Sequence, residues 1–444
     1  MRYTRAKELM LMEVDMGKVR VGINGFGRIG RNAFKIAFER DDVEIVAIND
    51  LTDTRTLAHL LKHDSSYGAY EHEVGHDDTG IIVKGLHIDV LTEKDPVLLP
   101  WRDKSVDVVI ESTGFFVDPT KARAHIDAGA KKVVISAPAK GDGATTIVLG
   151  VNEDKIAEAS DIISNASCTT NCITPVMAVL ESAFGIDKAM MTTVHSYTAS
   201  QRLQDAPAKD LREARAAAEN IVPTTTGASI AAAQALPVLA NKFGGLSVRV
   251  PTPVVSMSDF VVLVKRDVTI EEINQAFKDA AAKPFYQGIL DVTEEELVSS
   301  DFRGNSHSAI VDLPLTNVVG GNLIKVVAWY DNEWGYSNRL VELVADVGRA
   351  LQHAAVATTG IVPVEARASE TPVVVAQSDA TDSSDDALGE LDIHPVEEQP
   401  VAEVSEQVNE SVPAQEKPFD MPDELPEATD EQKAIHQERQ TAQW

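Results

Sequence analysis

The sequence predicts an α/β protein with two domains: a doubly wound, mostly parallel sheet, then an α+β domain with a mainly antiparallel sheet. Three observations support this fold class. The chain of 444 residues exceeds the length of one ordinary domain. Short apolar strands alternate with helical stretches up to about residue 167. Longer strands of alternating apolar and polar residues follow after residue 168.

Composition and strand pattern also predict the domain organisation. We expect an N-terminal extension over residues 1–17, a first domain over 18–167 and a second domain over 168–332. A terminal helix at about 333–355 should pack back on the first domain. Residues 364–444 are rich in Pro, Glu, Asp and Ser, so they are expected to form a disordered acidic tail.

The individual elements follow from local patterns. In the first domain the expected strands are residues 19–23, 43–48, 81–83, 106–110, 133–135 and 147–149, with helices at 31–39 and 119–128. In the second domain, strands are expected at 248–250 and 254–265 and a helix at 270–282, and the pattern of the terminal helix is clearest at 338–351. Thr269 with Glu272 three residues later is the capping-box pattern that starts a helix.

The net charge of −29 is spread unevenly. Residues 364–444 hold 21 acidic and 4 basic residues, which is more than half of the net charge. Nucleic acid is not an expected partner, because its phosphates would be repelled. No apolar run reaches the ~20 residues of a membrane helix, and residues 1–18 do not form a secretory signal. The only two cysteines are four residues apart, a spacing that does not suggest a disulfide framework. We therefore expect the protein in the reducing cytoplasm.

A glycine-rich turn follows the first strand. Gly25, Gly27 and Gly30 have the G-x-G-x-x-G spacing, lie between a strand and a helix, and precede an acid, Asp50, at the end of the next strand. This context indicates a Rossmann-like dinucleotide site with the pyrophosphate at the helix N-terminus. Asp50 would accept hydrogen bonds from the ribose hydroxyls and repel the 2′-phosphate of NADP, which favours NAD. The alternative is a glycine turn beside a surface aspartate.

Cys168 and Cys172 are the only cysteines, and they lie at a predicted strand-to-helix junction. A cysteine at a helix N-terminus gains thiolate character, so we expect a lowered pKa for Cys168. Cys172, one turn deeper, is expected to be a buried apolar residue. His195 ends an apolar strand and is a candidate base for Cys168. A histidine in that position is otherwise a structural hydrogen-bond partner.

Two further segments are candidates for binding anions. Residues 223–227 combine threonine hydroxyls with a turn glycine. Arg249 is the only charged residue between Lys242 and Asp259. An arginine in an apolar strand usually pairs with an anion, which here is either a buried carboxylate or a substrate phosphate.

Together these motifs resemble phosphorylating glyceraldehyde-3-phosphate dehydrogenase, over residues 18–351. In order, the matching features are the glycine turn, Ser167 to Cys172, His195, Thr224 to Gly227, Arg249, and Trp329 to Tyr336. The resemblance implies NAD-dependent oxidation and phosphorylation of D-glyceraldehyde 3-phosphate to 1,3-bisphosphoglycerate through a thioester on Cys168. It also implies a cytoplasmic homotetramer, in which residues 200–219 reach the neighbouring subunit's cofactor. No metal is implied.

The resemblance assigns roles to individual residues. Cys168 is the nucleophile and His195 its base. The sugar phosphate is bound by Thr198 and Arg249, and inorganic phosphate by Ser167, Thr169, Thr226 and Gly227. Cofactor contacts are assigned to Asn24, Gly25, Gly27, Arg28, Ile29, Gly30, Asp50, Lys94, Thr113, Ser136, Asn332 and Tyr336.

The chain departs from the family pattern at several positions. Ser200 stands where many bacterial members have Asp, Ala206 replaces a leucine of strictly NAD-dependent members, and Ile230 replaces a common lysine. Two alternatives stay open. Erythrose-4-phosphate dehydrogenase shares the Cys–His pair but lacks the Thr-Thr-Gly loop. The acidic tail could also recruit or regulate partners, with the enzyme as scaffold.

Overall fold

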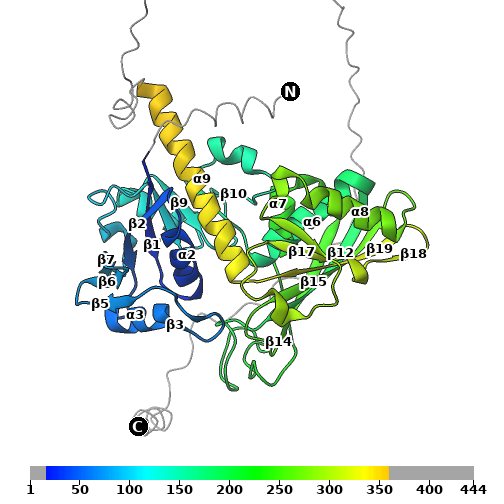
Figure 1. Ribbon diagram of the computed structural model, residues 1–444, viewed down its shortest axis with the longest axis horizontal. Coiled ribbons are helices and arrows are strands. Elements are labelled where there is room, and N and C mark those ends of the chain that lie inside the picture. The colour runs from blue at the N-terminus through cyan, green and yellow to red at the C-terminus, as the bar shows by residue number, and fades with distance from the viewer. Residues whose placement is uncertain (1–16, 360–444) are drawn as a thin grey trace, which may run out of the picture. The chain divides into compact units, whose positions relative to one another are not determined.

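The computed structural model describes residues 17–359 (Figure 1). The expectations for the N-terminal extension up to residue 16 and for the acidic tail lie outside these residues. No helix in this described part is long and apolar enough to cross a membrane.

The first sheet has the strand order β10-β11-β9-β8-β1-β2-β7-β6-β5. Strands β10 to β7 along this order pair in parallel, and β6 and β5 add an antiparallel edge. The expectation of a mostly parallel, doubly wound sheet is therefore confirmed. The bounds are β1 Val19–Asn24, β2 Val43–Asn49, β5 Val74–His76, β6 Gly80–Val83, β7 Leu86–Leu91, β8 Val108–Glu111, β9 Lys132–Ile135, β10 Thr145–Thr146 and β11 Ile162–Ser164.

The helices of this domain differ in part from the expected ones. Their bounds are α2 Arg28–Phe38, α3 Thr54–Lys62, α4 Pro119–Ala122, α5 Ala124–Asp127 and α9 Trp334–Thr359. The expected helix at 119–128 is split at Arg123, after a start capped by Asp118. Helix α9 packs against α2, β1 and β8, and its apolar face joins the core formed by these elements (Figure 1).

One expected strand is absent among the described residues. Residues 147–149 are buried but do not form a ladder. The backbone N–H of Val148 donates to the Asn152 side chain at 2.8 Å, and Gly150 turns the chain with φ +80°. The strand expected at 147–149 is therefore wrong, because the Asn152 side chain accepts the hydrogen bond of a backbone N–H that a neighbouring strand would otherwise use. The neighbouring strand, β10, ends at Thr146.

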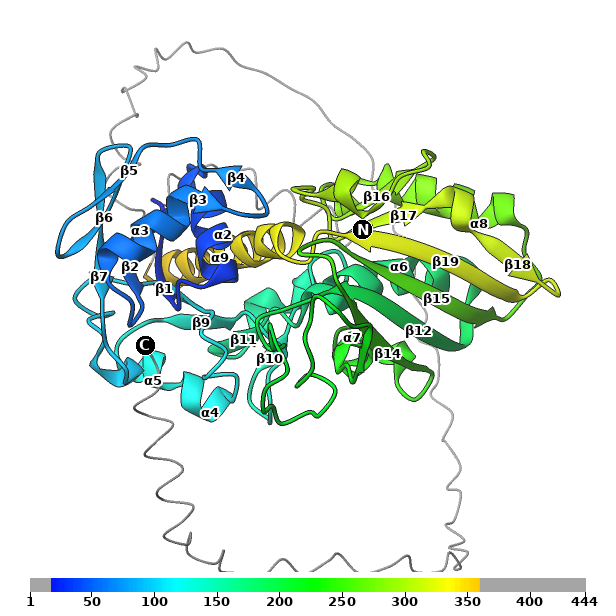
Figure 2. The same ribbon diagram turned by 90° about the horizontal axis from the view of Figure 1, so that it is seen from below.

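The second sheet has the order β13-β14-β12-β15-β19-β17-β16, with β18 beside β19 (Figure 2). Its pairs are antiparallel except β12–β14 and β16–β17, so the mainly antiparallel expectation is confirmed. The bounds are β12 Ile186–Ser196, β13 Val222–Thr224, β14 Phe243–Val250, β15 Ser256–Val264, β16 Leu290–Thr293, β17 Ala309–Asp312, β18 Asn317–Val319 and β19 Leu323–Tyr330. A two-residue hairpin pair, β3 His63–Asp64 and β4 Gly68–Ala69, belongs to the first domain.

Three helices pack on the second sheet. Their bounds are α6 Cys168–Phe184, α7 Ala228–Ala235 and α8 Ile270–Ala281. Helix α8 starts with the expected capping box of Thr269 and Glu272. Short 3₁₀ turns lie at Pro96–Leu98, Glu153–Glu158, Pro237–Leu239, Pro284–Tyr286, Ser299–Phe302 and Leu313–Leu315. The apolar faces of α6, α8 and the sheet form the core of this domain, which includes Cys172.

Candidate active site

Cys168 lies at the junction that the sequence predicts. After β11 the backbone turns sharply at Ala166, whose φ is +53°. Ser167 is the N-cap of α6, and its hydroxyl accepts a hydrogen bond from the backbone N–H of Thr170 at 3.1 Å. Cys168 is therefore the first residue of the helix and is half-buried. Its backbone N–H belongs to the helix end that has no intrahelical acceptors.

His195 is held in one tautomer beside this cysteine. Its Nδ1 lies 2.7 Å from the carbonyl oxygen of Ser196, which can only accept, so Nδ1 carries the proton. Nε2 is then free to accept, and it lies 3.4 Å from Cys168 Sγ. Strands β12 and β14 are parallel neighbours, and their register pairs His195 with Arg249. Cys168 and His195 thus lie together as the sequence predicts, and Arg249 lies beside His195 on the neighbouring strand.

Burial sets the protonation of this pair. It raises the pKa of the Cys168 thiol, although the charge of Arg249 and a hydrogen bond from Thr169 oppose this rise. The expectation of a lowered thiol pKa is therefore wrong for the unliganded protein, because burial outweighs the helix end. Burial and the charge of Arg249 lower the pKa of His195 to about 3. The resting pair is a neutral thiol beside a neutral imidazole that can take its proton.

Cys168 and His195 open into a cavity of about 270 Å³. All of the residues assigned to catalysis and to the two phosphates line it: Ser167, Cys168, Thr169, His195, Thr198, Thr226, Gly227 and Arg249. Thr225, from the predicted anion-binding segment 223–227, lines it as well, and the sequence did not single out three further lining residues, which are Pro138, Ala228 and Ser247. Ser247 could have been found from strand alternation, since it lies two residues before Arg249 and shares its face.

The cavity is built to receive anions. Arg249 Nε and Ser247 Oγ are buried and have no hydrogen-bond partner. No ion pair of Arg249 occurs within residues 17–359, so the alternative of a buried carboxylate partner finds no support there. The N-termini of α6 and α7 both reach the cavity, and the N-cap of α7 is Gly227, which has no side chain to cap the helix. Two helix ends and a guanidinium favour negative charge at this place.

Two hydroxyl pairs order the cavity wall. Thr198 Oγ1 lies 3.0 Å from the hydroxyl of Ser200, so the serine that departs from the family pattern supports the assigned threonine. Thr169 Oγ1 lies 3.0 Å from the hydroxyl of buried Tyr330. The ring of Tyr330 also meets His195 edge-on, with ring centroids 6.1 Å apart.

The residues assigned to the cofactor form a row along the first sheet. Asp50, Gly25, Thr113 and Ser136 follow the carboxyl ends of β2, β1, β8 and β9, which are neighbours in this order. Ligands of open parallel sheets bind at this edge. Exposed Lys94 lies beyond β7, the next strand along the sheet.

The glycine turn fits a dinucleotide. Gly25 has φ +93°, and a Cβ there would meet the backbone of Thr113 at 2.7 Å. A Cβ on Gly30 would lie 2.1 Å from the carbonyl oxygen of Gly25. A Cβ on Gly27 would meet nothing within 4 Å, so this glycine keeps space open at the N-terminus of α2. Gly27 caps α2 without a side chain, which leaves the first backbone N–H groups for a pyrophosphate.

Known proteins decide the family. Residues 19–119 match the family described as glyceraldehyde 3-phosphate dehydrogenase, NAD binding domain, and residues 167–332 match its C-terminal domain. The glyceraldehyde-3-phosphate dehydrogenase of Streptomyces coelicolor is 55% identical over 335 residues, which are 75% of this chain and 99% of that protein. The chain belongs to the glyceraldehyde-3-phosphate dehydrogenase family.

Other relatives agree. The Geobacillus stearothermophilus enzyme is 54% identical over 74% of this chain and 97% of its own length. Glyceraldehyde-3-phosphate dehydrogenase 1 of Bacillus subtilis is 53% identical over 74% of this chain and 98% of its own length. The chain is therefore an NAD-dependent oxidoreductase of this family, and the cofactor row described above belongs to its NAD-binding domain.

Several residues that the resemblance assigns to the cofactor have backbone N–H groups or free lone pairs to offer it. The carboxylate of Asp50 accepts from the backbone N–H groups of Phe26 at 2.8 Å and Thr52 at 3.0 Å, and it keeps lone pairs for ribose hydroxyls. The guanidinium of Arg28 is used by Asp64 and Glu333, so its backbone N–H, with that of Ile29 next to it, would face the pyrophosphate.

Asn332 and Tyr336 follow β19, about 300 residues after the glycine turn in the sequence. Asn332 is buried, and its Oδ1 accepts from the hydroxyl of Ser256 at 3.1 Å. Ser256 Oγ itself accepts from the backbone N–H of Ser196 at 3.1 Å, so this chain of bonds ties Asn332 to the strand of the base. The hydroxyl of Tyr336 donates to the carbonyl of Ala166 at 3.2 Å, at the turn before Cys168.

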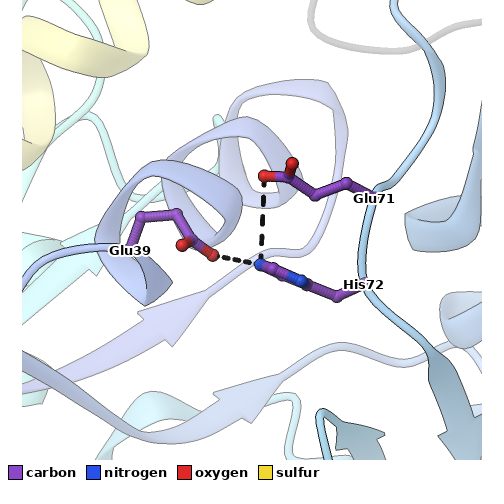
Figure 3. Close-up of side chains that lie close together, drawn as sticks. All are labelled: Glu39, Glu71 and His72. Carbon is purple, nitrogen blue, oxygen red and sulfur yellow. Dashed lines mark hydrogen bonds and ion pairs between the residues drawn. The ribbon is translucent and has the colours of Figure 1, made fainter.

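One group of metal-type ligands lies apart from these residues within the described part of the dehydrogenase. Glu39, Glu71 and His72 have ligand atoms within 4.8 Å of one another (Figure 3). His72 Nε2 hydrogen-bonds to Glu39 and lies 4.0 Å from Glu71 Oε1. Both glutamates are exposed. The hydrogen bond between His72 and Glu39 accounts for this arrangement.

Proposed function

We propose that this chain oxidises and phosphorylates D-glyceraldehyde 3-phosphate to 1,3-bisphosphoglycerate through a thioester on Cys168. The observation that carries this proposal is the 3.4 Å contact between Cys168 Sγ and the unprotonated Nε2 of His195. The contact lies inside a cavity whose free cationic and hydroxyl groups suit phosphate.

The chemistry begins at sulfur. As Cys168 Sγ attacks the aldehyde carbon, His195 Nε2 takes the thiol proton and passes it to the former carbonyl oxygen, which gives a hemithioacetal. His195 then removes that hydroxyl proton as the thioester forms. NAD, when bound, accepts the hydride that leaves the same carbon. The backbone N–H of Cys168, at the start of α6, is suited to stabilise the negative oxygen.

Phosphate completes the reaction. Inorganic phosphate attacks the thioester carbon, and the thiolate of Cys168 leaves and regains a proton from His195. The two steps require two anion sites on one cavity. Arg249 and Thr198 are proposed for the sugar phosphate. Ser167, Thr169, Thr226 and Gly227 are proposed for inorganic phosphate, which would meet the N-termini of α6 and α7.

Cys168→Ser tests the covalent route. We expect this variant to bind NAD but to lose acyl-enzyme formation, measured as the burst of absorbance from reduced cofactor without phosphate. Substantial steady-state oxidation by the variant would contradict the thioester. Assays of the unchanged enzyme with erythrose 4-phosphate, with and without phosphate, would separate the alternative dehydrogenase. We expect phosphate-dependent turnover of glyceraldehyde 3-phosphate to dominate, because Thr225, Thr226 and Gly227 are retained.

A homotetramer is the assembly that we propose. Leu203 and Leu211, in the segment between β12 and β13, are 83% and 82% exposed. On the outer sheet face, Met190 is directly paired with Val261, and the two are 63% and 41% exposed. Apolar surfaces of this kind mark contacts with other chains. Light scattering should give four times the chain mass of 47.9 kDa, and charged substitutions at Met190 and Leu203 should lower it.

We also propose a cytoplasmic location. Cys168 must stay a free thiol for this reaction, and a reducing compartment preserves it. Cell fractionation with an antibody to this chain would test the location. A partner of the acidic tail is a separate proposal that rests on its charge alone.

A further inference from the structure

Three polar side chains lie in register beneath the cofactor edge of the first sheet. Asn49, Asn24 and Glu111 end the adjacent parallel strands β2, β1 and β8, and their Cα atoms are direct partners. All three are buried, with exposures of 4%, 2% and 1%. Asn49 Nδ2 donates to Asn24 Oδ1 at 2.7 Å, and Asn24 Nδ2 donates to Glu111 Oε2 at 2.5 Å. Both polar atoms of the Asn24 amide thus make hydrogen bonds within this row.

The carboxylate of Glu111 joins two cofactor loops. Its Oε1 accepts from the backbone N–H of Thr113 at 2.8 Å and from the Thr113 hydroxyl at 2.5 Å. Its Oε2 accepts from Asn24, the residue before Gly25. Gly25 approaches the backbone of Thr113 so closely that a Cβ would overlap it. The carboxylate therefore fixes the loop after β8 against the glycine turn.

The fourth bond to this carboxylate comes from His125, which is fully buried in α5. His125 Nε2 lies 3.1 Å from Glu111 Oε2, and Nδ1 lies 3.0 Å from the indole Nε1 of Trp101. An indole N–H can only donate, so Nδ1 must accept and Nε2 must carry the proton. Trp101 thus sets the tautomer in which His125 donates to Glu111. The four donors saturate the buried carboxylate, which has about four lone-pair sites.

Chemistry at the cavity does not use this chain of bonds. None of Trp101, Glu111 and His125 lines the cavity around Cys168. A buried carboxylate needs its donors, because removing one leaves charge unsatisfied in a low-dielectric interior. Loss of His125 would therefore destabilise the two segments that the Glu111 carboxylate holds, which are the loop of Thr113 and the glycine turn.

We propose that His125 is a positioning residue for NAD, acting through Glu111 to hold the loop of Thr113 against the glycine turn in the NAD-binding geometry. The proposal rests on the NAD-dependent function proposed above. It predicts that changes at His125 weaken NAD binding and leave the chemical step at saturating NAD nearly intact. A residue that only supports the fold would lower stability without this division between binding and turnover.

The test compares His125→Leu with His125→Gln in the full chain. Leucine removes both hydrogen bonds, whereas the glutamine amide can accept from Trp101 and donate to Glu111. We expect His125→Leu to raise the dissociation constant for NAD about 10-fold, measured by calorimetry, with kcat at saturating NAD within about twofold of the unchanged enzyme. His125→Gln should restore most of the affinity.

A milder matched pair guards against misfolding. Trp101→Phe removes the indole donor, and Trp329→Phe removes a comparable bond from an indole N–H to Asp312 at 2.9 Å in the other domain. We expect NAD affinity to weaken about threefold in Trp101→Phe and to stay unchanged in Trp329→Phe. Unchanged affinity in His125→Leu and Trp101→Phe, or equal losses in Trp329→Phe, would overturn the proposal. Failure of the unchanged enzyme to bind NAD would instead contradict the proposed function.

Discussion

At the scale of single residues, Arg249 stands out because it acts on both partners of the catalytic pair. Its positive charge lowers the pKa of the Cys168 thiol against the effect of burial. The same charge adds to burial in lowering the pKa of His195. One side chain thus favours a thiolate and a neutral base together, and it lines the anion cavity with its Nε unpartnered.

Replacing Arg249 by Leu should raise the pKa of Cys168. Removing the positive charge leaves burial unopposed by it, and the thiolate is the reactive form, so alkylation by iodoacetamide should slow at neutral pH. The pH profile of the alkylation rate should move to higher pH. Arg266→Leu is the matched control, since Arg266 packs over Phe184 away from the cavity. An unshifted profile in Arg249→Leu would argue against this electrostatic role.

Replacing His195 by Asn should slow hydride transfer by about 10²–10⁴, the usual cost of losing a general base. The asparagine amide can still donate to the carbonyl of Ser196, but it offers no basic nitrogen to Cys168. Stopped-flow absorbance of the first turnover measures this step apart from product release. Binding of NAD should stay within about twofold, because His195 lies on β12 of the other domain. A first turnover at the unchanged rate would exclude His195 as the base.

The residues of the candidate site were largely predictable, whereas their energetics were not. Cys168, His195 and Arg249 were predicted because their residue types and the spacing of their motifs can be read directly from the sequence. Ser247 was not predicted, because it belongs to the site only through lying on the same face of β14 as Arg249. The thiol pKa was predicted in the wrong direction, since a helix end is visible in the sequence and burial of the sulfur is not.

At the scale of elements, the β1–α2 turn separates two uses of glycine. Gly30 must be small because the carbonyl of Gly25 lies against it. Gly27 has φ −73° and open space around its Cβ position, so the protein alone tolerates a side chain there. A glycine is required at position 27 only if a ligand lies against the turn.

Gly27→Ala should therefore keep the thermal stability of the unliganded protein while weakening NAD binding about 10-fold or more. The added methyl group occupies the place where the pyrophosphate approaches the helix N-terminus. Gly30→Ala serves as the contrast, because overlap with the turn should lower the melting temperature as well as affinity. Differential scanning calorimetry and NAD titration give the two readouts. Full NAD affinity in Gly27→Ala would mean that the cofactor lies elsewhere.

Element boundaries show what local patterns miss. Helix α6 begins at Cys168, at the junction expected from the sequence, because Ser167 caps it there. Helix α9 runs from Trp334 to Thr359, beyond the 338–351 pattern at both ends and past the expected end at about residue 355. The expected strand at 147–149 failed because Asn152 takes a backbone donor. Caps and side-chain bonds of this kind decide the ends of elements, and apolar periodicity does not record them.

At the scale of the whole molecule, distant segments meet at the cofactor edge. Arg28, at the start of α2, bridges to Asp64 and to Glu333, which lies 305 residues away beside Asn332. Tyr67 donates to Asp331 at 2.8 Å and adds a second link between the NAD-binding domain and the residues after β19. The glycine turn and the segment of Asn332, which is assigned to the cofactor, are thereby joined through an ion pair and a hydrogen bond that no local sequence pattern predicts.

Removing residues 364–444 should leave kcat, KM and the melting temperature of the enzyme unchanged. The cavity and both sheets are built from residues before 360, and the removed segment carries 21 acidic against 4 basic residues. Its loss should raise the isoelectric point and lower solubility, measured by isoelectric focusing and by precipitation with ammonium sulfate. Activity that rises on truncation, most strongly at low salt, would instead reveal an inhibitory contact with the cationic cavity around Arg249, because salt screens such an attraction.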